Sequence, residues 1–337
     1  MPQAAGLINV FLDICFSGRL VNFCNFSHLY LTMPIKISRD LPAYNALREE
    51  RVFVMTDDRA ERQDIRPLSI AIVNLMPTTV DTEIQLLRLL GNTPLQVDIS
   101  FLRMGSHESR NAPPGHLEKF YTFAKEIMLN DCRYDGFIIT GAPVETLPFE
   151  EVDYWEELAA VIDYTRAHVF STLHICWGAQ AGLYRHYGIL KHALSKKLFG
   201  IFPHGVNERH SPLFRGFDDE FLAPQSRHTA SDRDAIAREP ALTIQSETEE
   251  AGVFITTARA GREIYVSGHL EYDPLTLDRE YRRDLGRGLP IEIPKNYYPG
   301  GDPSKAPVVR WRAHAHLFFS NWLNYVYQET PFDLAKL

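Results

Sequence analysis

The sequence predicts an α/β fold in which a mostly parallel sheet is flanked by helices, with an added C-terminal elaboration of helices and loops. Two observations predict it. Short apolar runs rich in β-branched residues alternate with helical periodicity through the first two thirds of the chain, and Gly- and Pro-containing turns separate them. Strands that alternate with helices of about 10–18 residues need crossover connections, which make neighbouring strands parallel. Apolar residues at 45% and charged residues at 23% exclude a disordered or low-complexity chain.

The first buried strand is predicted at 66–76, RPLSIAIVNLM, because a nearly continuous apolar run is typical of a strand covered on both faces. Helical spacing begins after Thr79, and Gly91 is a suitable stop. Residues 95–103, LQVDISFLR, alternate in polarity and predict a second strand. Residues 115–130 have the periodicity of a helix.

Two further strands are predicted at 134–140 and 169–175, with a helix over 150–167 between them. The later strand stops at Cys176, and helical spacing then runs to about Tyr187. This order completes a series of strand–helix units that a parallel sheet requires.

Beyond residue 190 the periodicity weakens. Residues 198–232 are rich in Gly, Pro, His and Phe and predict loops with short strands. In chain order, three strands, a helix, a turn-rich loop and a closing helix are predicted at 242–246, 252–257, 263–268, 274–286, 290–307 and 311–327.

Residues 1–32 differ from the rest of the chain. They are apolar and aromatic, but polar residues keep every apolar run far too short for a membrane span. No Lys or Arg precedes the apolar part and no small-residue cleavage site closes it, so a secretory signal is a poor fit. A second methionine, Met33, begins a stretch typical of the start of a cytosolic protein. We therefore expect residues 1–32 to be an extension or an upstream-start artefact, and 33–337 to form a single catalytic domain.

Charge and cysteine content narrow the class of function. The chain has 35 Lys and Arg against 43 Asp and Glu, a net charge of −8, which argues against nucleic acid as the main partner. The four cysteines, at positions 15, 24, 132 and 176, form no C-x-x-C pair and show no metal-ligand spacing. They suit a reducing compartment, so a cytoplasmic protein with at most one catalytic thiol is expected.

A candidate nucleophile lies where a predicted buried strand meets a helix. Reactive groups of open α/β sheets lie at the carboxyl ends of strands, and Cys176 occupies such a place. There the positive end of the helix dipole stabilises a thiolate, and the backbone N–H of Trp177 is placed to bind an oxyanion. By itself, a cysteine after an apolar strand is more often a small buried hydrophobe.

A second strand end supplies partners for the thiol. His269 and Glu271 follow the strand predicted at 263–268, so the histidine is a candidate base and the glutamate a candidate orienting group. An exposed histidine beside a solvated glutamate is the alternative. Two suitable partners at strand ends, in the order that the chemistry needs, favour catalysis.

These motifs resemble a known family. ICWGAQ (175–180) and GHLE (268–271) resemble the class I glutamine amidotransferase-like fold, which is flavodoxin-like in its layering. From Met33 onward the chain is similar to the homoserine O-acyltransferases of methionine biosynthesis. The similarity covers nearly all of 33–337 through strings such as RPLSIAIVNLMPTTVDTE, ESRNAPPGHL, TGAPVE and NYYPGGDP.

The resemblance implies a ping-pong acyl transfer. Cys176 would take an acyl group from acyl-CoA as a thioester, and His269 would remove the proton of the γ-hydroxyl of L-homoserine that attacks it. Glu271 would hold His269, and Trp177 would provide a backbone oxyanion donor. The resemblance implies no permanently bound cofactor or metal. It also implies that the protein forms a homodimer.

Further residues match family positions that bind substrate: Lys197, Ser226 and Arg283. Without the resemblance, each would be assigned as an ordinary surface lysine, loop serine or helix-face arginine. One departure is Leu270, where relatives often have Pro, and it is expected to change loop stiffness more than chemistry.

The resemblance also bears on the acyl donor. Glu145, two residues after the proline of the GAP loop, stands where a glutamate is associated with acetyl-CoA and a glycine with succinyl-CoA. A carboxylate facing the acyl pocket would repel the far carboxylate of a succinyl group. The acetyl-CoA-using type is therefore expected, unless Glu145 points to solvent and selects nothing.

Other functions compete with this one. They are succinyl transfer, a glutaminase with the same triad, and a redox-sensing or chaperone-like protein of the same fold. A metal site is disfavoured, because His314 and His316 are two positions apart on a predicted helix and face different sides.

Overall fold

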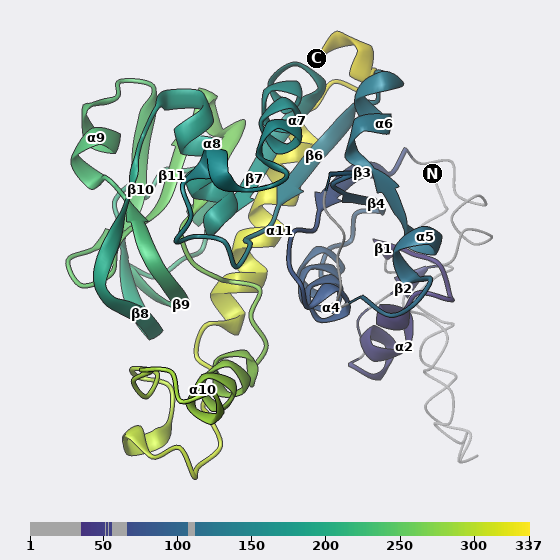
Figure 1. Ribbon diagram of the computed structural model, residues 1–337. Helices are drawn as coiled ribbons and strands as arrows, with labels where there is room; N and C mark the ends of the chain where they lie inside the picture. Colours follow the sequence, from purple (N-terminus) through teal and green to yellow (C-terminus); the bar gives the residue numbers. More distant parts are fainter. Residues whose placement is uncertain (1–34, 51, 53, 56–65, 107–111) are drawn as a thin grey trace, which may run out of the picture. The chain divides into compact units, whose positions relative to one another are not determined.

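The computed structural model describes residues 35–50, 52, 54–55, 66–106 and 112–337 (Figure 1). The chain divides into two units, Met1–Thr32 and Met33–Leu337, and all described residues belong to the second. The expected N-terminal extension lies outside the described residues, so the proposed division into extension and catalytic domain stays a prediction. None of the helices in the described part of the chain is both long enough and apolar enough to span a membrane.

Strands and helices alternate along the first half of the described chain (Figure 1). The strands are β1 (Ile35–Lys36), β2 (Val54–Met55), β3 (Leu68–Val73), β4 (Val97–Arg103), β5 (Tyr121–Phe123), β6 (Tyr134–Ile139), β7 (Val169–Ile175), β8 (Lys191–Val206), β9 (Glu220–Ser231), β10 (Leu242–Thr248), β11 (Gly252–Ala258) and β12 (Glu263–Val266). The helices are α2 (Pro42–Glu49), α4 (Thr79–Leu90), α5 (His116–Phe120), α6 (Ala124–Leu129), α7 (Trp155–His168), α8 (Trp177–Tyr187), α9 (Arg233–Arg238), α10 (Thr276–Gly286) and α11 (Arg312–Glu329).

The strands form one mixed sheet in the order β2-β1-β4-β3-β6-β7-β12-β11-β10-β8-β9, with β5 beside β4. From β2 to β12 neighbouring strands are parallel, and from β12 to β9 they are antiparallel. The predicted α/β architecture with a mostly parallel sheet is confirmed. The antiparallel extension was not anticipated as part of the same sheet.

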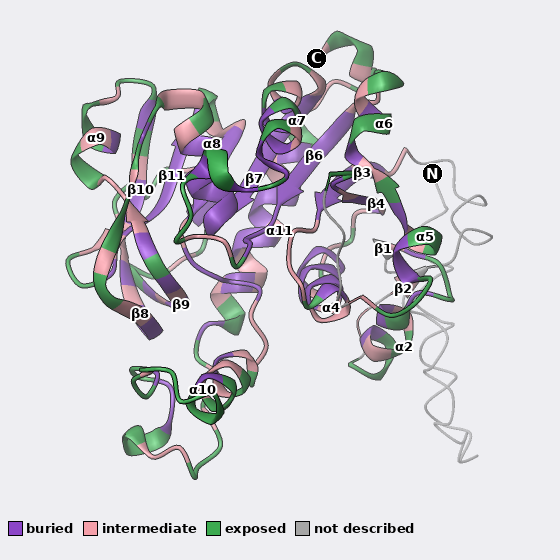
Figure 2. Cartoon of the chain, in the orientation of Figure 1, coloured by how far each residue is buried: buried purple, intermediate pink, exposed green. Residues whose placement is uncertain are grey.

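Helices cover both faces of the parallel part. Along β3, Ile70 and Ile72 pack into one core with α4 and α11, while Ala71 and Val73 pack into a second core with α6 and α7. Every residue of β6 and β7 is buried, as the purple ribbon in Figure 2 shows. This burial on both faces explains the continuous apolar runs of these strands.

Several sequence predictions are confirmed closely, among them the strands now seen as β3, β6 and β7 and the helices α4 and α8. The helix expected over 115–130 is wrong in part, because β5 interrupts it between α5 and α6. The aromatic and β-branched stretch Phe120–Phe123 favours extended backbone, and Tyr121 donates a hydrogen bond to the buried carboxylate of Glu83 (2.7 Å).

The prediction of loops with short strands over 198–232 is also wrong. Strands β8 and β9 form a long antiparallel hairpin there. Its two prolines, Pro203 and Pro224, misled the sequence reasoning, since proline normally interrupts strands. Strand β9 is the outermost strand of the sheet, so no further strand needs the N–H that Pro224 lacks. The Pro224 carbonyl instead accepts a hydrogen bond from His269 N–H (3.0 Å).

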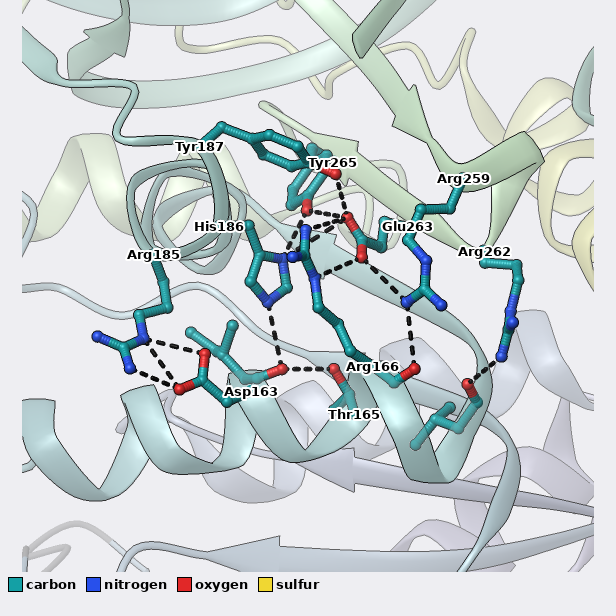
Figure 3. Close-up of polar contacts among 12 residues, drawn as sticks. Asp163, Thr165, Arg166, Arg185, His186, Tyr187, Arg259, Arg262, Glu263 and Tyr265 are labelled. Atoms are coloured by element: carbon teal, nitrogen blue, oxygen red, sulfur yellow. Dashed lines mark hydrogen bonds and ion pairs between the residues drawn. The ribbon is translucent and has the colours of Figure 1, made fainter. Parts of the chain in front are cut away.

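Helix α8 is anchored at its C-terminal end by a buried polar cluster, shown in Figure 3. The Glu263 carboxylate, at the start of β12, accepts hydrogen bonds from Arg166 (2.8 Å to Nε) and from the Tyr187 hydroxyl (2.6 Å). His186 lies 3.6 Å from the same carboxylate. Because His186 and Tyr187 end α8, this cluster fixes the helix whose other end begins at Trp177.

Candidate active site

Cys176 occupies a sharp turn between β7 and α8, as the sequence predicts. Its backbone has φ 52° and ψ −114°, a conformation that costs free energy for any residue with a Cβ. The turn is tight because α8 begins directly against the end of β6. A Cβ at Gly178 would lie 2.6 Å from Thr140 O and 2.8 Å from Ile139 O, so only glycine fits there.

His269 and Glu271 lie beside this turn because β12 and β7 are parallel neighbours in register, with Val266 opposite Ile175. His269 Nδ1 and Glu271 Oε1 are 2.7 Å apart, and the His269 side chain also hydrogen-bonds Cys176. The three predicted catalytic side chains therefore form a continuous Cys–His–Glu chain. Both His269 and Glu271 are buried.

The electrostatics of the triad favour a charged imidazole. Burial alone would lower the pKa of His269, but the negative charges of Cys176 and Glu271, and hydrogen bonds to both, raise that pKa well above its usual value. The charged form of the imidazole is therefore favoured beside Cys176. An imidazolium paired with a thiolate is the reactive form of a cysteine nucleophile.

The loop after β6 lies over the nucleophile. A Cβ built on Gly141 would lie 3.2 Å from Cys176 Cβ and 3.5 Å from His269 Cε1. The Thr140 hydroxyl accepts a hydrogen bond from Leu75 N–H (2.8 Å) and donates one to Gly141 O (3.1 Å), which fixes the direction of that carbonyl.

At the start of α8, the Trp177 N–H has no acceptor among the described residues. Of its first N–H groups, those of Ala179 and Gln180 donate to Cys176 O. The N–H of Trp177 lies next to the nucleophile in the chain and begins the helix, so it is the candidate oxyanion donor that the sequence suggested.

Lys197, Ser226 and Arg283 are brought together by a residue that sequence reasoning missed, Glu280. Its carboxylate binds Lys197 Nζ (2.5 Å) and accepts hydrogen bonds from the Ser226 hydroxyl (2.9 Å to each oxygen). Arg283 Nη2 lies 3.7 Å from Glu280, and its Nε donates to Asp284 (2.7 Å). The result is a cluster of alternating charges, with two cations and two carboxylates.

Tyr272 connects this charged cluster to the triad. Its ring stacks on the imidazole of His269, with centroids 4.0 Å apart and planes inclined by 14°. Burial and then the nearby charge of Glu280 raise the pKa of Tyr272 well above its usual value. The sequence held a signal for both missed residues. Tyr272 follows GHLE directly, and Glu280 is three positions before Arg283 on one helix face.

Glu145 is half-buried, and its carboxylate contacts the protein. Its Oε2 accepts a hydrogen bond from the Thr229 hydroxyl (3.2 Å), which also bonds Gln180 Oε1 on α8 (3.0 Å). Lys191 Nζ donates to the backbone carbonyls of Glu145 and Leu147 (2.6 Å each) and so holds the loop in place. Glu145 therefore lies next to the helix that begins at the nucleophile.

In the described part of the chain, no three His, Cys, Asp or Glu side chains are grouped as a metal site. Both histidines of the disfavoured metal pair lie on α11, and His314 Nε2 contacts Asp218 Oδ2 at 3.2 Å.

Comparison with known proteins agrees with this arrangement. Residues 34–332 match a family model described as homoserine O-succinyltransferase. Two curated relatives named homoserine O-acetyltransferase are 58% identical over 307 residues (Bacteroides fragilis, 90% of this chain and 100% of the relative) and 59% identical over 303 residues (Brevibacillus brevis, 90% and 98%). A glutamine amidotransferase from Thermotoga maritima shares the fold, with a TM-score of 0.52 at 12% identity over 78% of this chain and 99% of that one.

Proposed function

The chain belongs to the homoserine acyltransferase family of methionine biosynthesis, and from that premise we propose that it transfers an acetyl group from acetyl-CoA to the γ-hydroxyl of L-homoserine. The observation that carries the proposal is the hydrogen-bonded Cys176–His269–Glu271 chain with the half-buried Glu145 beside it. The products would be O-acetyl-L-homoserine and free CoA.

The first half-reaction loads the enzyme. The Cys176 thiolate attacks the thioester carbonyl of acetyl-CoA, and the oxyanion that forms is stabilised by the Trp177 N–H. The bond between carbon and the CoA sulfur then breaks, and the departing thiolate takes the proton of the His269 imidazolium. The enzyme is left as an S-acetyl Cys176 thioester with a neutral His269.

Acylation prepares the second half-reaction. It removes the negative charge of Cys176, which is one of the two charges that raise the pKa of His269, so the imidazole becomes available as a base. His269 takes the proton of the homoserine hydroxyl while that oxygen attacks the thioester. The carbon–Sγ bond breaks, and the thiolate–imidazolium pair is restored. Glu271 holds the imidazole throughout.

The charged cluster around Glu280 suits a zwitterionic amino acid. Arg283 and Lys197 are placed to bind the homoserine carboxylate, and Glu280 the ammonium group, with Ser226 as a further hydrogen-bonding partner. The cluster lies next to the triad through Tyr272, so a substrate bound there would present its side-chain hydroxyl to His269.

Donor choice is proposed to depend on Glu145. Its carboxylate is held in the pocket by Thr229, where it would oppose the far carboxylate of a succinyl group and leave room for acetyl. A like-charge contact of this kind costs several kcal/mol, which corresponds to roughly 10²-fold selectivity.

One experiment tests both the nucleophile and the donor. The protein is mixed with equal concentrations of acetyl-CoA and succinyl-CoA without homoserine, and the adduct is measured by intact-protein mass spectrometry. We expect a predominantly acetylated protein, no adduct in Cys176→Ala, and at least a tenfold shift towards the succinyl adduct in Glu145→Gly. Glutamate release from glutamine without CoA release from acetyl-CoA would indicate a glutaminase and overturn the proposal.

We also propose a cytoplasmic homodimer without a permanently bound cofactor. The resemblance to the family supports it. Sedimentation velocity with detection at protein and cofactor wavelengths tests the last two points, and a monomer or a bound chromophore would contradict them.

A further inference from the structure

A buried arginine next to the acyl pocket has no role in the chemistry described so far. Arg227, on β9, is only 3% exposed. Its Nε donates to Gln225 Oε1 (3.2 Å), Nη1 to Thr229 O (2.8 Å) and Nη2 to Ala251 O (2.5 Å). All three acceptors are neutral, and they use three of the five N–H groups of the guanidinium.

Such an environment is unfavourable for a charge. A buried guanidinium keeps its proton, so its charge needs compensation that neutral carbonyls supply only in part. Burial lowers the pKa of Arg227, whereas the negative charges of Cys176 and Glu145 raise it. The compensating anions are therefore the nucleophile and the residue proposed to select the acyl donor.

The geometry joins Arg227 to Glu145 through one residue. Thr229 accepts from Arg227 through its backbone carbonyl and donates to Glu145 Oε2 through its hydroxyl. Gln180, at the start of α8, shares that hydroxyl. Arg227, on β9, and Glu145, on the loop after β6, thus contact the same residue of β9, next to the first turn of the nucleophile helix.

Two half-buried arginines elsewhere in the described chain are held differently. Arg66 forms a two-point ion pair with Asp135, and Arg166 forms one with Glu263. Lys191 is the other cation near Glu145, but its ammonium is held by the two backbone carbonyls of the loop and lies over the Phe149 ring (4.4 Å). Lys191 therefore holds the backbone of the Glu145 loop, whereas Arg227 has no such contact with that loop in the described part of the chain and is left as the positive charge behind Glu145.

We propose that Arg227 is a specificity-determining residue, the counter-charge of the acyl pocket. With Glu145 present the pair is balanced, and a neutral acetyl group fits. Without Glu145 the guanidinium, with two N–H groups to spare, attracts the terminal carboxylate of a succinyl group. This inference rests on the proposed acyl-donor role of Glu145, and it adds that a glycine at that position would permit succinyl transfer through an attraction as well as through space.

The sharpest test leaves Arg227 untouched. In Glu145→Gly, kcat/KM is measured with succinyl-CoA and with succinamoyl-CoA, its neutral amide of nearly equal shape. If Arg227 attracts the carboxylate, we expect succinyl-CoA to be preferred by about tenfold or more. Equal values for the two donors would mean that Glu145 acts only by filling space, and would overturn the inference.

Substitution of Arg227 then identifies the source of the attraction. In the Glu145→Gly background, Arg227→Gln is expected to lower kcat/KM for succinyl-CoA at least tenfold more than for acetyl-CoA, and Arg227→Lys is expected to retain most of the preference. Equal losses on both donors would assign Arg227 a structural role. The matched control is Arg262→Gln, since Arg262 also donates to two backbone carbonyls, those of Val169 and Phe170, but lies at the start of β12.

A reagent-based measurement separates this inference from the proposed function. Iodoacetate and iodoacetamide alkylate the same thiol but differ by one negative charge, so their rate ratio at Cys176 reports the charge of the pocket. We expect Arg227→Gln to lower the iodoacetate-to-iodoacetamide ratio about tenfold and Arg262→Gln to leave it unchanged, with the modified peptide quantified by mass spectrometry. A reduced ratio together with an unaltered donor preference in Glu145→Gly would disprove the donor role of Glu145 alone. An unaltered ratio in Arg227→Gln would disprove the counter-charge.

Discussion

Two buried clusters, each with a glutamate, a histidine and a tyrosine, lie at the two ends of helix α8. Its N-terminal end adjoins His269, Glu271 and Tyr272, and its C-terminal end carries the partners of Glu263, shown in Figure 3. The helix has 11 residues, so the two clusters are separated by about 16 Å. Both clusters contain histidine, glutamate and tyrosine, but only the Glu263 cluster contains arginine, and the hydrogen bonding of the two carboxylates differs.

Both carboxylate oxygens of Glu263 accept two hydrogen bonds or more. Oε1 accepts from Arg166 (2.8 Å) and Arg259 (3.4 Å), and Oε2 accepts from Tyr187 (2.6 Å) and Tyr265 (3.0 Å). Burial would raise the pKa of Glu263, but hydrogen bonds from its partners and their charges hold that pKa far below the usual range. A carboxylate fixed in this way cannot exchange a proton near neutral pH.

In the triad, one carboxylate oxygen of Glu271 is left without a hydrogen bond from the described residues. Glu271 Oε1 bonds His269, whereas its buried Oε2 has no hydrogen-bond partner among the described residues. The remaining ring nitrogen of His269 serves Cys176, whose charge comes and goes during the proposed reaction. The two carboxylates therefore differ: both oxygens of Glu263 are used to hold the fold, whereas Glu271 keeps one oxygen unused beside the histidine that is proposed to move protons.

The largest effect is expected at the triad. Glu271→Gln keeps the shape of the side chain but removes the charge that supports the imidazolium and can bind the wrong tautomer of His269. We expect kcat/KM to fall by about 10³–10⁴-fold, with little change in the midpoint of thermal unfolding. Steady-state kinetics and calorimetry measure the two quantities, and a loss below tenfold would contradict an orienting role for Glu271.

The opposite pattern is expected at Glu263. Glu263→Gln leaves Arg166 and Arg259 without their anion, so the free energy of unfolding should fall by about 2–4 kcal/mol while kcat/KM per folded molecule stays within about threefold. Because the pKa of Glu263 is lowered on folding, its contribution is present above the unfolded pKa, near 4.3, and is lost as pH falls. Urea unfolding at pH 7 and pH 4 should therefore show a smaller acid-induced loss in the variant. A variant as stable as the parent at pH 7, or one with much lower kcat/KM, would break the comparison.

Two glycines give the smallest and most closely matched test. A methyl group at Gly141 would meet Cys176 and His269 at 3.2 and 3.5 Å, and one at Gly182 would meet His174 and Tyr265 at 2.7 Å each. We expect Gly141→Ala to lower kcat/KM roughly ten- to a hundredfold at nearly constant stability. Gly182→Ala should instead cost about 1–3 kcal/mol of unfolding free energy and leave the folded enzyme active. Steady-state kinetics and urea denaturation of both variants measure these effects. A loss of stability in Gly141→Ala, or a loss of activity of folded Gly182→Ala, would contradict the functional difference between the two ends of α8.

Sequence reasoning recovers the parallel core because its strands are buried on both faces, and burial leaves a direct apolar signature. It also predicts the positions of Cys176, His269 and Glu271 at the ends of β7 and β12, because each short motif follows its strand in the chain. The β8–β9 hairpin escapes it, since proline and glycine within those strands resemble loop signals, and what holds them is pairing between distant segments.

The same limit explains the missed site residues. Glu280 matters because it meets Lys197 and Ser226, which come from the two strands of that hairpin. The role proposed for Arg227 depends on its burial on β9 and on Thr229, which contacts both Arg227 and Glu145. A single sequence does not show these contacts, because each of them depends on which distant segments of the chain become neighbours in the fold.

The backbone conformation of Cys176 affects which residues are favourable at this position. At φ 52° and ψ −114°, every residue with a side chain carries a penalty of about 1–3 kcal/mol that glycine avoids. Selection for a durable fold alone would replace this residue with glycine and gain stability at once. With Cys176 as the proposed nucleophile, the thiol is present at the expense of stability, and a protein that did not need the reaction would be more stable with glycine at this position.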